Sequence, residues 1–484
     1  MKLIEYIAQD NIRGLMPLRS TALLAELGEA KIREYLFSQI LSANDHASFL
    51  PSPVVYALKD KFHARKILQL DPVSAFYIYD FTHRNSASFQ KDKTPKANKK
   101  QYGYSFDKNN PVNSLKEYHA FRMRKYDLKK EYKYYAKVDI ANCFNSFYHH
   151  DVVSFISRNI NQPESEQLGQ FLREINSGRS VNCFPQGIFP AKVIGNFFLN
   201  FIEGSLELKS SAIIRYLDDV FLFSNNLDAL EQDVLKLQSI IGERCLALNP
   251  EKTKFGSKLS DFEERKLDKI QKSLMRKREF AKDYDGDEDI EVELEPKEIE
   301  YLKSLLNKKN SLAEEDVELV LALLKSDQSE ASYLIELVLS NYPSLTKNLY
   351  QYMSDINDNG EIWGIVKQKI AQEYIHEFEL FWITRIIIDR FCFGKEYAEI
   401  LLKIFNHRCS TPIIQAAILE VENNNFGLYE LKEVYLRNSS SSIPAACAVV
   451  GLLKFEKAKR NQVYKYAGNG SNFMHLVCDI CTNN

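Results

Sequence analysis

The chain has 484 residues, more than one hydrophobic core usually supports, so we expect two or three domains. A hydrophobic share of 45% with 26% charged residues is ordinary for a folded soluble protein, which excludes a chain too polar to bury a core. The 63 Lys and Arg residues nearly balance the 65 Asp and Glu residues, so the net charge alone indicates no polyanionic partner.

Targeting and redox features favour the cytoplasm. The N-terminal sequence MKLIEYIAQDN carries charge and has no apolar run of signal-sequence length. The most apolar stretch, residues 381–389, is short and interrupted by charge, so it predicts a buried helix. Eight cysteines are scattered without a disulfide framework, and the lone Cys478-Asp-Ile-Cys481 lacks the second ligand pair that zinc requires. We therefore expect a cytoplasmic protein without a membrane partner.

Charge is distributed unevenly along the chain. From Lys91 to Lys137 there are roughly three basic residues for each acidic one, with Tyr residues between them. This segment favours nucleic acid at one face of the protein, with a solvated lysine-rich loop as the alternative. Residues 283–300 are strongly acidic, which predicts a solvated linker or an exposed hairpin, with a metal site as the alternative.

The first part of the chain has helical spacing of apolar residues over 1–60, which predicts a helical N-terminal lobe. Residues 65–81 then predict a strand, a proline-containing turn and a helix. The polar, lysine-rich segment 85–113 predicts a long loop or a β-ribbon insertion, and loops of that length usually have a function or are disordered.

The middle of the chain, residues 132–258, alternates short β-branched and aromatic runs with helical stretches. This texture is typical of an α/β or α+β core. Tyr134–Ile140 predicts a buried strand, Ala191–Leu206 a helix, and Ile213–Ser224 a β-hairpin.

The C-terminal half is helical in pattern. A charged helix is expected to about residue 279, followed by the acidic stretch, and from Pro296 onward amphipathic helices of ordinary length succeed one another. Stacked helix pairs would bury such faces, which favours an α-solenoid-like domain, although no strict repeat period is present.

Three acidic residues carry the strongest chemical signal. Asp218 and Asp219 follow one another at the centre of the predicted hairpin, where ionised neighbours repel and lose hydration. A divalent cation offsets that cost, because Mg²⁺ prefers hard oxygen ligands. Asp139 comes near the end of another apolar strand, where ligands commonly lie. The alternatives are a water-exposed Asp-Asp turn and a helix N-cap at Asp139.

Four motifs in order resemble the palm of reverse transcriptases. They are the Asp139-x-x-x-x-Phe144 block, Pro185-Gln186-Gly187, the Tyr216-x-Asp218-Asp219 box, and Leu248-Asn-Pro-Glu-Lys-Thr253. The resemblance covers about residues 60 to 260. It implies an α+β right-hand polymerase, with fingers and an RRM-like palm with an antiparallel sheet, followed by an all-α helical-repeat (HEAT-like, solenoid) domain.

The resemblance also implies a division of the chain. Residues 1–60 would be the helical N-terminal lobe, 61–260 the fingers and palm, 261–300 a charged helix with an acidic linker, and 301–484 the C-terminal α-helical repeat domain.

Metal-dependent nucleotide addition is the activity that the resemblance implies. Asp139, Asp218 and Asp219, with the backbone carbonyl of Ile140, are expected to hold two Mg²⁺ ions about 4 Å apart, with Mn²⁺ as a substitute. The substrates would be dNTPs, and the nucleic-acid partner an RNA template or a DNA product. The protein would then mainly position the reactants and neutralise charge.

Further residues match the family's substrate-binding positions. Phe144 falls where a ring under the sugar would clash with a 2′-hydroxyl and favour dNTPs. Gln186 and Gly187 match the turn that packs on nucleotide and template, where Gly permits close backbone approach. Tyr216 of the Tyr-x-Asp-Asp box is also expected to be a substrate-binding residue.

Two cations complete the predicted substrate site. Arg65 resembles the fingers residue whose guanidinium grips the triphosphate, with a surface Arg as the alternative. Lys252 resembles the lysine near the pyrophosphate, and Lys254 is its alternate.

The layout of a palm followed by helices looks like the bacterial abortive-infection and defence-associated (antiphage) reverse transcriptases. That group implies a homo-oligomer, synthesis without a conventional template or from a non-coding RNA, and in some members priming from a protein hydroxyl. One alternative is a retron-like or intron-like enzyme that copies a dedicated RNA. The other is an inactive polymerase that serves as a binding scaffold.

Overall fold

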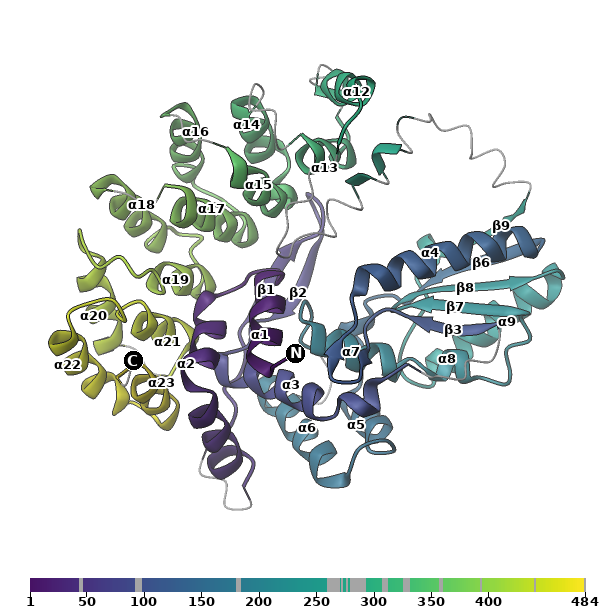
Figure 1. The fold of residues 1–484 in the computed structure, drawn as a ribbon, viewed down its shortest axis with the longest axis horizontal. Helices are drawn as coiled ribbons and strands as arrows, with labels where there is room; N and C mark the ends of the chain where they lie inside the picture. Colours follow the sequence, from purple (N-terminus) through teal and green to yellow (C-terminus); the bar gives the residue numbers. More distant parts are fainter. Residues whose placement is uncertain are drawn as a thin grey trace. The chain divides into compact units, whose positions relative to one another are not determined.

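The computed structural model describes residues 1–42, 47–91, 98–179, 184–258, 293–306, 312–324, 331–356, 360–391, 394–438 and 441–482, with 270, 273–275 and 277–278 in addition (Figure 1). Its contacts divide the chain into two compact units. The sheet unit comprises Met1–Asp10, Leu36–Pro53 and Leu68–Lys266. The helical unit comprises Asn11–Tyr35, Val54–Ile67 and Leu267–Asn484.

This division differs from the predicted segments in one respect. Two N-terminal stretches, residues 11–35 and 54–67, pack with the C-terminal helices rather than with the rest of an N-terminal lobe. Contacts between residues so far apart in the sequence leave no periodic signal, which is why the pattern of apolar residues did not indicate them. As boundaries of independently folding domains, the predicted segments stay a prediction, and most of the 261–300 linker lies outside the described residues.

The sheet unit is built on a five-stranded sheet whose strand order is β3-β7-β8-β6-β9. The strands are β3 (Lys99–Tyr102), β6 (Tyr134–Asp139), β7 (Ala212–Tyr216), β8 (Asp219–Ser224) and β9 (Lys254–Ser257). Only β3 pairs in parallel, with β7, and the other pairs are antiparallel. The predicted strand at 134–140 and the predicted hairpin at 213–224 form as β6 and as β7 with β8. The mixed α+β class expected from the sequence is confirmed.

Helices cover both faces of this sheet (Figure 1). Helix α4 (Ser114–Glu131) contacts β3, β7 and β8, and a cluster of buried side chains joins α4 to one face of the sheet. Helices α8 (Phe201–Gly204) and α9 (Leu227–Gly242) contact the strands from the other face. Because side chains alternate along a strand, Asp219 lies on the same face as Phe221 and Phe223. We call this face, which α4 covers, the carboxylate face.

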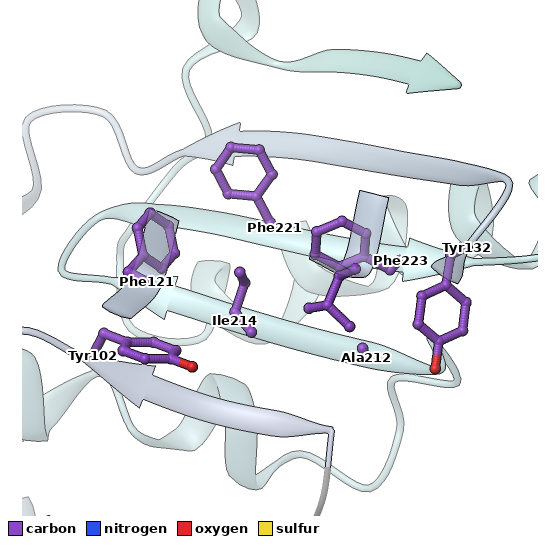
Figure 2. Packing of buried hydrophobic residues seen from close by; sticks show 8 residues of the cluster. Tyr102, Phe121, Tyr132, Ala212, Ile214, Phe221 and Phe223 are labelled. Carbon is purple, nitrogen blue, oxygen red and sulfur yellow. The ribbon is translucent and has the colours of Figure 1, made fainter. Parts of the chain in front are cut away.

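Aromatic rings fill the space between α4 and the carboxylate face (Figure 2). Phe121 of α4 lies 5.9 Å from Phe221 of β8, centroid to centroid. The buried members of this cluster are Tyr102, Phe121, Leu128, Tyr132, Ala212, Ile214, Phe221 and Phe223. Burial of this apolar area, at about 25 cal/mol per Å², holds α4 on the sheet.

The remaining helices of the sheet unit surround one end of the sheet. They are α3 (Pro72–Arg84), α5 (His149–Ile156), α6 (Gln162–Ile175) and α7 (Phe189–Phe198), with most of α1 (Leu3–Ile12). Helix α3 begins where Asp71 caps the backbone N–H groups of Val73 and Ser74, and Pro72 supplies a helical φ angle. The single helix predicted over 191–206 forms as two, α7 and α8. Part of the segment 85–113 forms β3 and the short pair β4 (Phe106–Asp107) and β5 (Asn110–Pro111), while residues 92–97 lie outside the described residues.

The helical unit contains α2 (Arg19–Tyr35), the two-stranded sheet of β1 (Val54–Leu58) and β2 (Ala64–Leu68), and the C-terminal helices. The described C-terminal helices of seven residues or more are α12 (Pro296–Leu306), α13 (Glu314–Leu323), α14 (Ala331–Asn341), α15 (Thr346–Tyr352), α16 (Gly360–Ile370), α17 (Glu377–Arg390), α18 (Lys395–Phe405), α19 (Pro412–Leu419), α20 (Leu428–Asn438), α21 (Ile443–Val450), α22 (Lys457–Gly468) and α23 (Asn472–Thr482).

These C-terminal helices follow a simple contact rule. Each odd-numbered helix from α13 to α21 contacts the next odd-numbered helix, so these helices form one row that ends at α23 (Figure 1). A second row contains the contacting pairs α14 with α16 and α20 with α22. The amphipathic helices predicted after residue 296 are therefore present. Their description as helical repeats stays a prediction. None of the helices in the described parts of the chain is both long and apolar enough to cross a membrane.

Candidate active site

The pairing of β6 with β8 brings the three aspartates together. Asp139, the last residue of β6, is the register partner of Asp219, the first residue of β8. The backbone N–H of Ile140 donates a hydrogen bond of 3.2 Å to the carbonyl oxygen of Asp218. Partners on adjacent antiparallel strands have Cα atoms about 5 Å apart. Residues separated by about 80 positions in the sequence thus form one acidic edge at the β7–β8 turn.

A buried arginine holds this turn in place. Leu217 has a left-handed φ of 53°, and its carbonyl oxygen accepts a 3.0 Å hydrogen bond from the guanidinium of Arg215. Arg215 is fully buried on the face opposite the carboxylates, where it pairs with Glu203 of α8 and donates to the side-chain oxygen of Asn196 of α7 at 2.9 Å. Arg215 is not among the residues predicted from the sequence. The available signal was a charged residue inside an otherwise apolar strand, which requires buried partners.

Two lysines pair with the aspartates. The ammonium of Lys252 lies 2.9 Å from Oδ1 of Asp139, and that of Lys137 lies 3.2 Å from Oδ1 of Asp219. Asp139 is almost fully buried, with 5% of its surface exposed. The hydrogen bond to Asp139 raises the pKa of Lys252, although partial burial opposes that shift. Lys252 thus contacts Asp139 in this structure, and its predicted place near a pyrophosphate stays a prediction.

The third carboxyl group, on Asp218, lies in an environment that disfavours its charged form. Burial raises the pKa of Asp218, the charges of Asp139 and Asp219 raise it further, and Lys252 opposes them. Any cation that approaches a carboxyl group in this environment stabilises its ionised form.

The acidic edge has the donor chemistry that Mg²⁺ prefers, namely carboxylate oxygens together with a nearby backbone carbonyl at residue 140. The side chains are nevertheless arranged around Lys252 and Lys137. Within the described ranges, no group of three or more His, Cys, Asp or Glu side chains is arranged to hold a metal ion. Pairing with lysines is thus a second way to offset the repulsion between the carboxylates, in addition to the divalent ion predicted from the sequence. The two-ion site therefore stays a prediction.

A backbone hydrogen bond joins Phe144 to Phe184, the residue directly before the Pro-Gln-Gly turn. The backbone N–H of Phe184 donates a 3.0 Å hydrogen bond to the carbonyl oxygen of Phe144. The ring of Phe144 is half-buried and packs 5.4 Å from the ring of Phe147. Gln186 is also half-buried, and Gly187 has a φ of 95°, which residues with a side chain rarely adopt. The glycine at this turn is therefore a conformational requirement of the loop that leads into α7.

Tyr216 lies on the carboxylate face and is held by α4. Its hydroxyl donates a 3.2 Å hydrogen bond to the carbonyl oxygen of Ser114, and its ring lies 5.2 Å from that of Tyr118 and 5.7 Å from that of Phe121. The predicted role of Tyr216 in substrate binding stays a prediction.

The remaining predicted cations lie elsewhere. Lys254 is exposed on β9, as the register partner of Lys137. Arg65 is exposed on β2, which belongs mainly to the helical unit, so the sheet unit alone does not contain it. Its predicted contact with a triphosphate stays a prediction.

A comparison with protein families assigns the part of the chain that contains the acidic edge to a family. Residues 80–303 match the family described as reverse transcriptase (RNA-dependent DNA polymerase). These residues form a reverse transcriptase domain. The matched stretch contains all five strands of the sheet, both lysine-paired aspartates and Asp218. The enzyme class expected from the sequence, RNA-directed DNA polymerase, is confirmed by this match.

Other comparisons add little to this assignment. No curated protein matches the chain at a significant level. Among solved structures, the chain is similar to telomerase from Candida albicans in complex with a fragment of telomeric RNA, with 10% sequence identity and a TM-score of 0.27. That similarity covers 79% of this chain and 70% of the telomerase chain. At this TM-score the assignment of the reverse transcriptase domain rests on the family match.

Proposed function

We propose that the chain synthesises DNA by adding dNTPs to a primer hydroxyl at the acidic edge of Asp139, Asp218 and Asp219. The observation that carries the proposal is the register pairing of Asp139 with Asp219, which puts the three carboxylates at one turn. These residues, with the carbonyl of Ile140, would hold two Mg²⁺ ions or Mn²⁺ in their place. When bound, such ions supply Lewis-acid stabilisation of charge on phosphoryl oxygens.

Residues of the chain itself account for the other requirements of nucleotide addition. Lys252, already next to Asp139, neutralises negative charge near the departing pyrophosphate. Phe144 supports the sugar and disfavours a 2′-hydroxyl. Gln186 and Gly187 bring the backbone close to the nucleotide, and Arg65 grips the triphosphate.

Replacing two carboxylates tests the site. The double variant Asp218→Asn, Asp219→Asn should lower dNTP incorporation by more than about 1,000-fold, because neutral amides bind divalent cations poorly and the metal ions would stabilise the developing charge. Incorporation of labelled dNTPs with Mg²⁺ measures the effect, and circular dichroism with thermal melting checks the fold. Asp228→Asn, at an exposed position of α9, is the matched control and should keep full activity. Synthesis at the wild-type rate by a folded double variant would refute the site.

We further propose that the protein acts in antiviral defence as a cytoplasmic homo-oligomer. Its DNA synthesis would either use no conventional template or copy a non-coding RNA. Synthesis would start from a protein hydroxyl. The support is the long helical array that follows the polymerase, which resembles the layout of abortive-infection reverse transcriptases. Incubating the protein with each dNTP singly and then together, and sequencing the product, distinguishes these modes. A product that copies one co-purified RNA would exclude synthesis without a template, and it would fit both templating by a non-coding RNA and the retron-like or intron-like alternative. Absence of any product would favour the scaffold alternative.

A further inference from the structure

Helix α7 begins directly after the Pro-Gln-Gly turn but has no capping side chain of its own. The residue at its N-cap position is Ile188, whose apolar side chain accepts no hydrogen bond, and Pro190 occupies the second helical position. The first backbone N–H groups of a helix need acceptors from outside the helix. The sequence next to Gly187 therefore leaves the start of α7 to be held by another part of the chain.

Asp10 of α1 supplies the missing acceptor. Its Oδ2 atom accepts a 2.6 Å hydrogen bond from the backbone N–H of Phe189, the first residue of α7. The same oxygen accepts a 2.5 Å hydrogen bond from the hydroxyl of Tyr79 in α3. Burial and the charge of Asp10 raise the pKa of Tyr79 well above its usual value, so this hydroxyl stays protonated and donates. A half-buried carboxylate at a helix N-terminus also interacts favourably with the helix dipole.

Tyr6 strengthens this contact from the same side of α1. It precedes Asp10 by four residues, so the two side chains share one face of the helix. The buried ring of Tyr6 lies 5.0 Å from that of Tyr79 and 5.7 Å from that of Phe189, centroid to centroid. One face of α1 thus contacts both α3 and the start of α7, through an aromatic ring and a carboxylate. All four residues belong to the sheet unit.

Helix α7 connects this anchor to the acidic edge. Near its end, the side-chain amide of Asn196 donates hydrogen bonds to the carbonyl oxygens of Tyr102 and Tyr104. The side-chain oxygen of Asn196 accepts a hydrogen bond from Arg215, which also holds the carbonyl oxygen of Leu217. A displacement of α7 would therefore affect both the Pro-Gln-Gly turn at its start and the β7–β8 turn.

We propose that Asp10 is a positioning residue for the nucleotide site. By capping α7, it holds the Pro-Gln-Gly turn in the conformation in which Gln186 and Gly187 contact the incoming dNTP. Phe189 follows Gly187 by two residues, so fixing its backbone N–H restricts the conformations of the turn. Asp10 acts through Phe189 and not on the reacting atoms. The inference rests on the proposed function for the identity of the substrate.

Steady-state kinetics of two variants test the positioning role. Asp10→Ala removes the acceptor and should raise the KM for dNTPs about 3- to 10-fold while kcat changes less than about 2-fold, because the apparent affinity falls with the fraction of turns in the binding conformation. Asp10→Asn keeps an oxygen that accepts the two hydrogen bonds, so its KM should stay within about 2-fold of the wild-type value. The measurement is dNTP incorporation by the full chain with Mg²⁺.

Hydrogen exchange distinguishes positioning from general stability. In Asp10→Ala we expect the amides of Phe189 and Ala191 to exchange about 10-fold faster, as the loss of a helix cap implies, while the amides of β6 and β8 keep their wild-type rates. The matched control is Glu5→Ala, which removes an exposed carboxylate from the same helix and should change neither KM nor exchange. A lower melting temperature of Asp10→Ala with an unchanged KM would make Asp10 a purely structural residue and overturn the proposal.

The remaining outcomes are also decisive. If Asp10→Ala does not fold, Tyr79→Phe removes one donor to the same carboxylate and should raise the KM for dNTPs about 2- to 3-fold, and no change would overturn the proposal. A KM as high in Asp10→Asn as in Asp10→Ala would also overturn it, because the hydrogen bonds would then not be the cause. Absence of synthesis by the wild-type chain would refute the proposed function and this inference with it, whereas an unchanged KM in an active Asp10→Ala variant would refute this inference alone.

Discussion

At the scale of single residues, the ring of Phe144 lies against the backbone of α7. A Cβ atom added at Gly195 would come within 2.8 Å of Cε1 of Phe144 and 3.0 Å of Cε2 of Phe147. Gly195 therefore leaves the space that the Phe144 ring occupies. A side chain of any size at that position must displace one of the two rings, because real Cβ atoms do not approach carbon so closely.

Sugar selection should depend on this contact. Phe144→Ala is expected to lower the preference for dNTP over rNTP, as a ratio of kcat/KM, by about 10- to 100-fold because the clash with the 2′-hydroxyl disappears. Gly195→Ala should lower kcat/KM for dNTPs by displacing the ring, and adding Phe144→Ala to it should remove that loss. Gly204→Ala, where nothing lies within 4 Å, is the control for a glycine replacement in the same unit. An unchanged preference in Phe144→Ala would place sugar selection elsewhere.

A residue's role could be predicted where the sequence pattern around it indicates its partners. The acidic triad could be predicted in this way, since Asp139, Asp218 and Asp219 each sit at the end of an apolar run that predicts a strand. The role of Arg215 could not be predicted, because it depends on contacts with Glu203 and the carbonyl oxygen of Leu217. The periodicity of apolar residues does not indicate these contacts.

At the scale of elements, α19 and α21 approach each other at Gly451, the residue that follows α21. A Cβ atom added there would lie 2.0 Å from the carbonyl oxygen of Leu419 and 2.9 Å from Cε of Lys432. The first of these atoms belongs to the backbone, so the helices themselves would have to separate.

Gly451→Ala should therefore destabilise the helical unit by about 3 kcal/mol or more. Gly364→Ala is the matched control, because Gly364 lies inside α16 with nothing within 4 Å of an added Cβ. It should stabilise the protein by about 0.5 to 1 kcal/mol, as expected for Gly to Ala in a helix. Urea unfolding of the full chain measures both. Equal stability of the two variants would mean that α19 and α21 do not pack this closely.

Element boundaries followed the sequence where local chemistry determines them. Helix α3 begins at Pro72, directly after its N-cap Asp71, and both residues are start signals in any context. The helix expected over 191–206 instead breaks into α7 and α8, because apolar residues continue through the break and hide it. The position of α4 over the carboxylate face could not be derived either, because apolar and polar residues are spread almost evenly around this 18-residue helix and mark no side as the buried one.

At the scale of the whole molecule, the helical unit begins near the N-terminus and is completed near the C-terminus. Glu420, after α19, accepts hydrogen bonds from the backbone N–H groups of Arg19 at 3.1 Å and Ser20 at 2.9 Å. It thereby caps the first turn of α2 and also pairs with Arg385 at 3.0 Å. This one carboxylate joins residues 400 positions apart in the sequence.

Glu420→Gln should destabilise the full chain by about 2 kcal/mol, because the amide accepts weaker hydrogen bonds and leaves Arg385 with less opposing charge. The control is Glu422→Gln, two residues further on, which removes an exposed pair with Lys454 and should change stability by less than about 0.5 kcal/mol. Chemical unfolding of both variants provides the comparison. If Glu420→Gln costs no more than Glu422→Gln, then α2 is held by its apolar contacts alone.

The late completion of this unit matters during protein synthesis. Helix α2 contacts α21 and α23, which a ribosome makes some 400 residues after Ser20, the distance already spanned by the Glu420 bond. At about 5 to 20 residues per second, α2 waits about 20 to 80 seconds for these partners. Its apolar side is exposed to chaperones and to other nascent chains in that interval. A chain whose synthesis stops late therefore contains helix α2 without its partners α21 and α23.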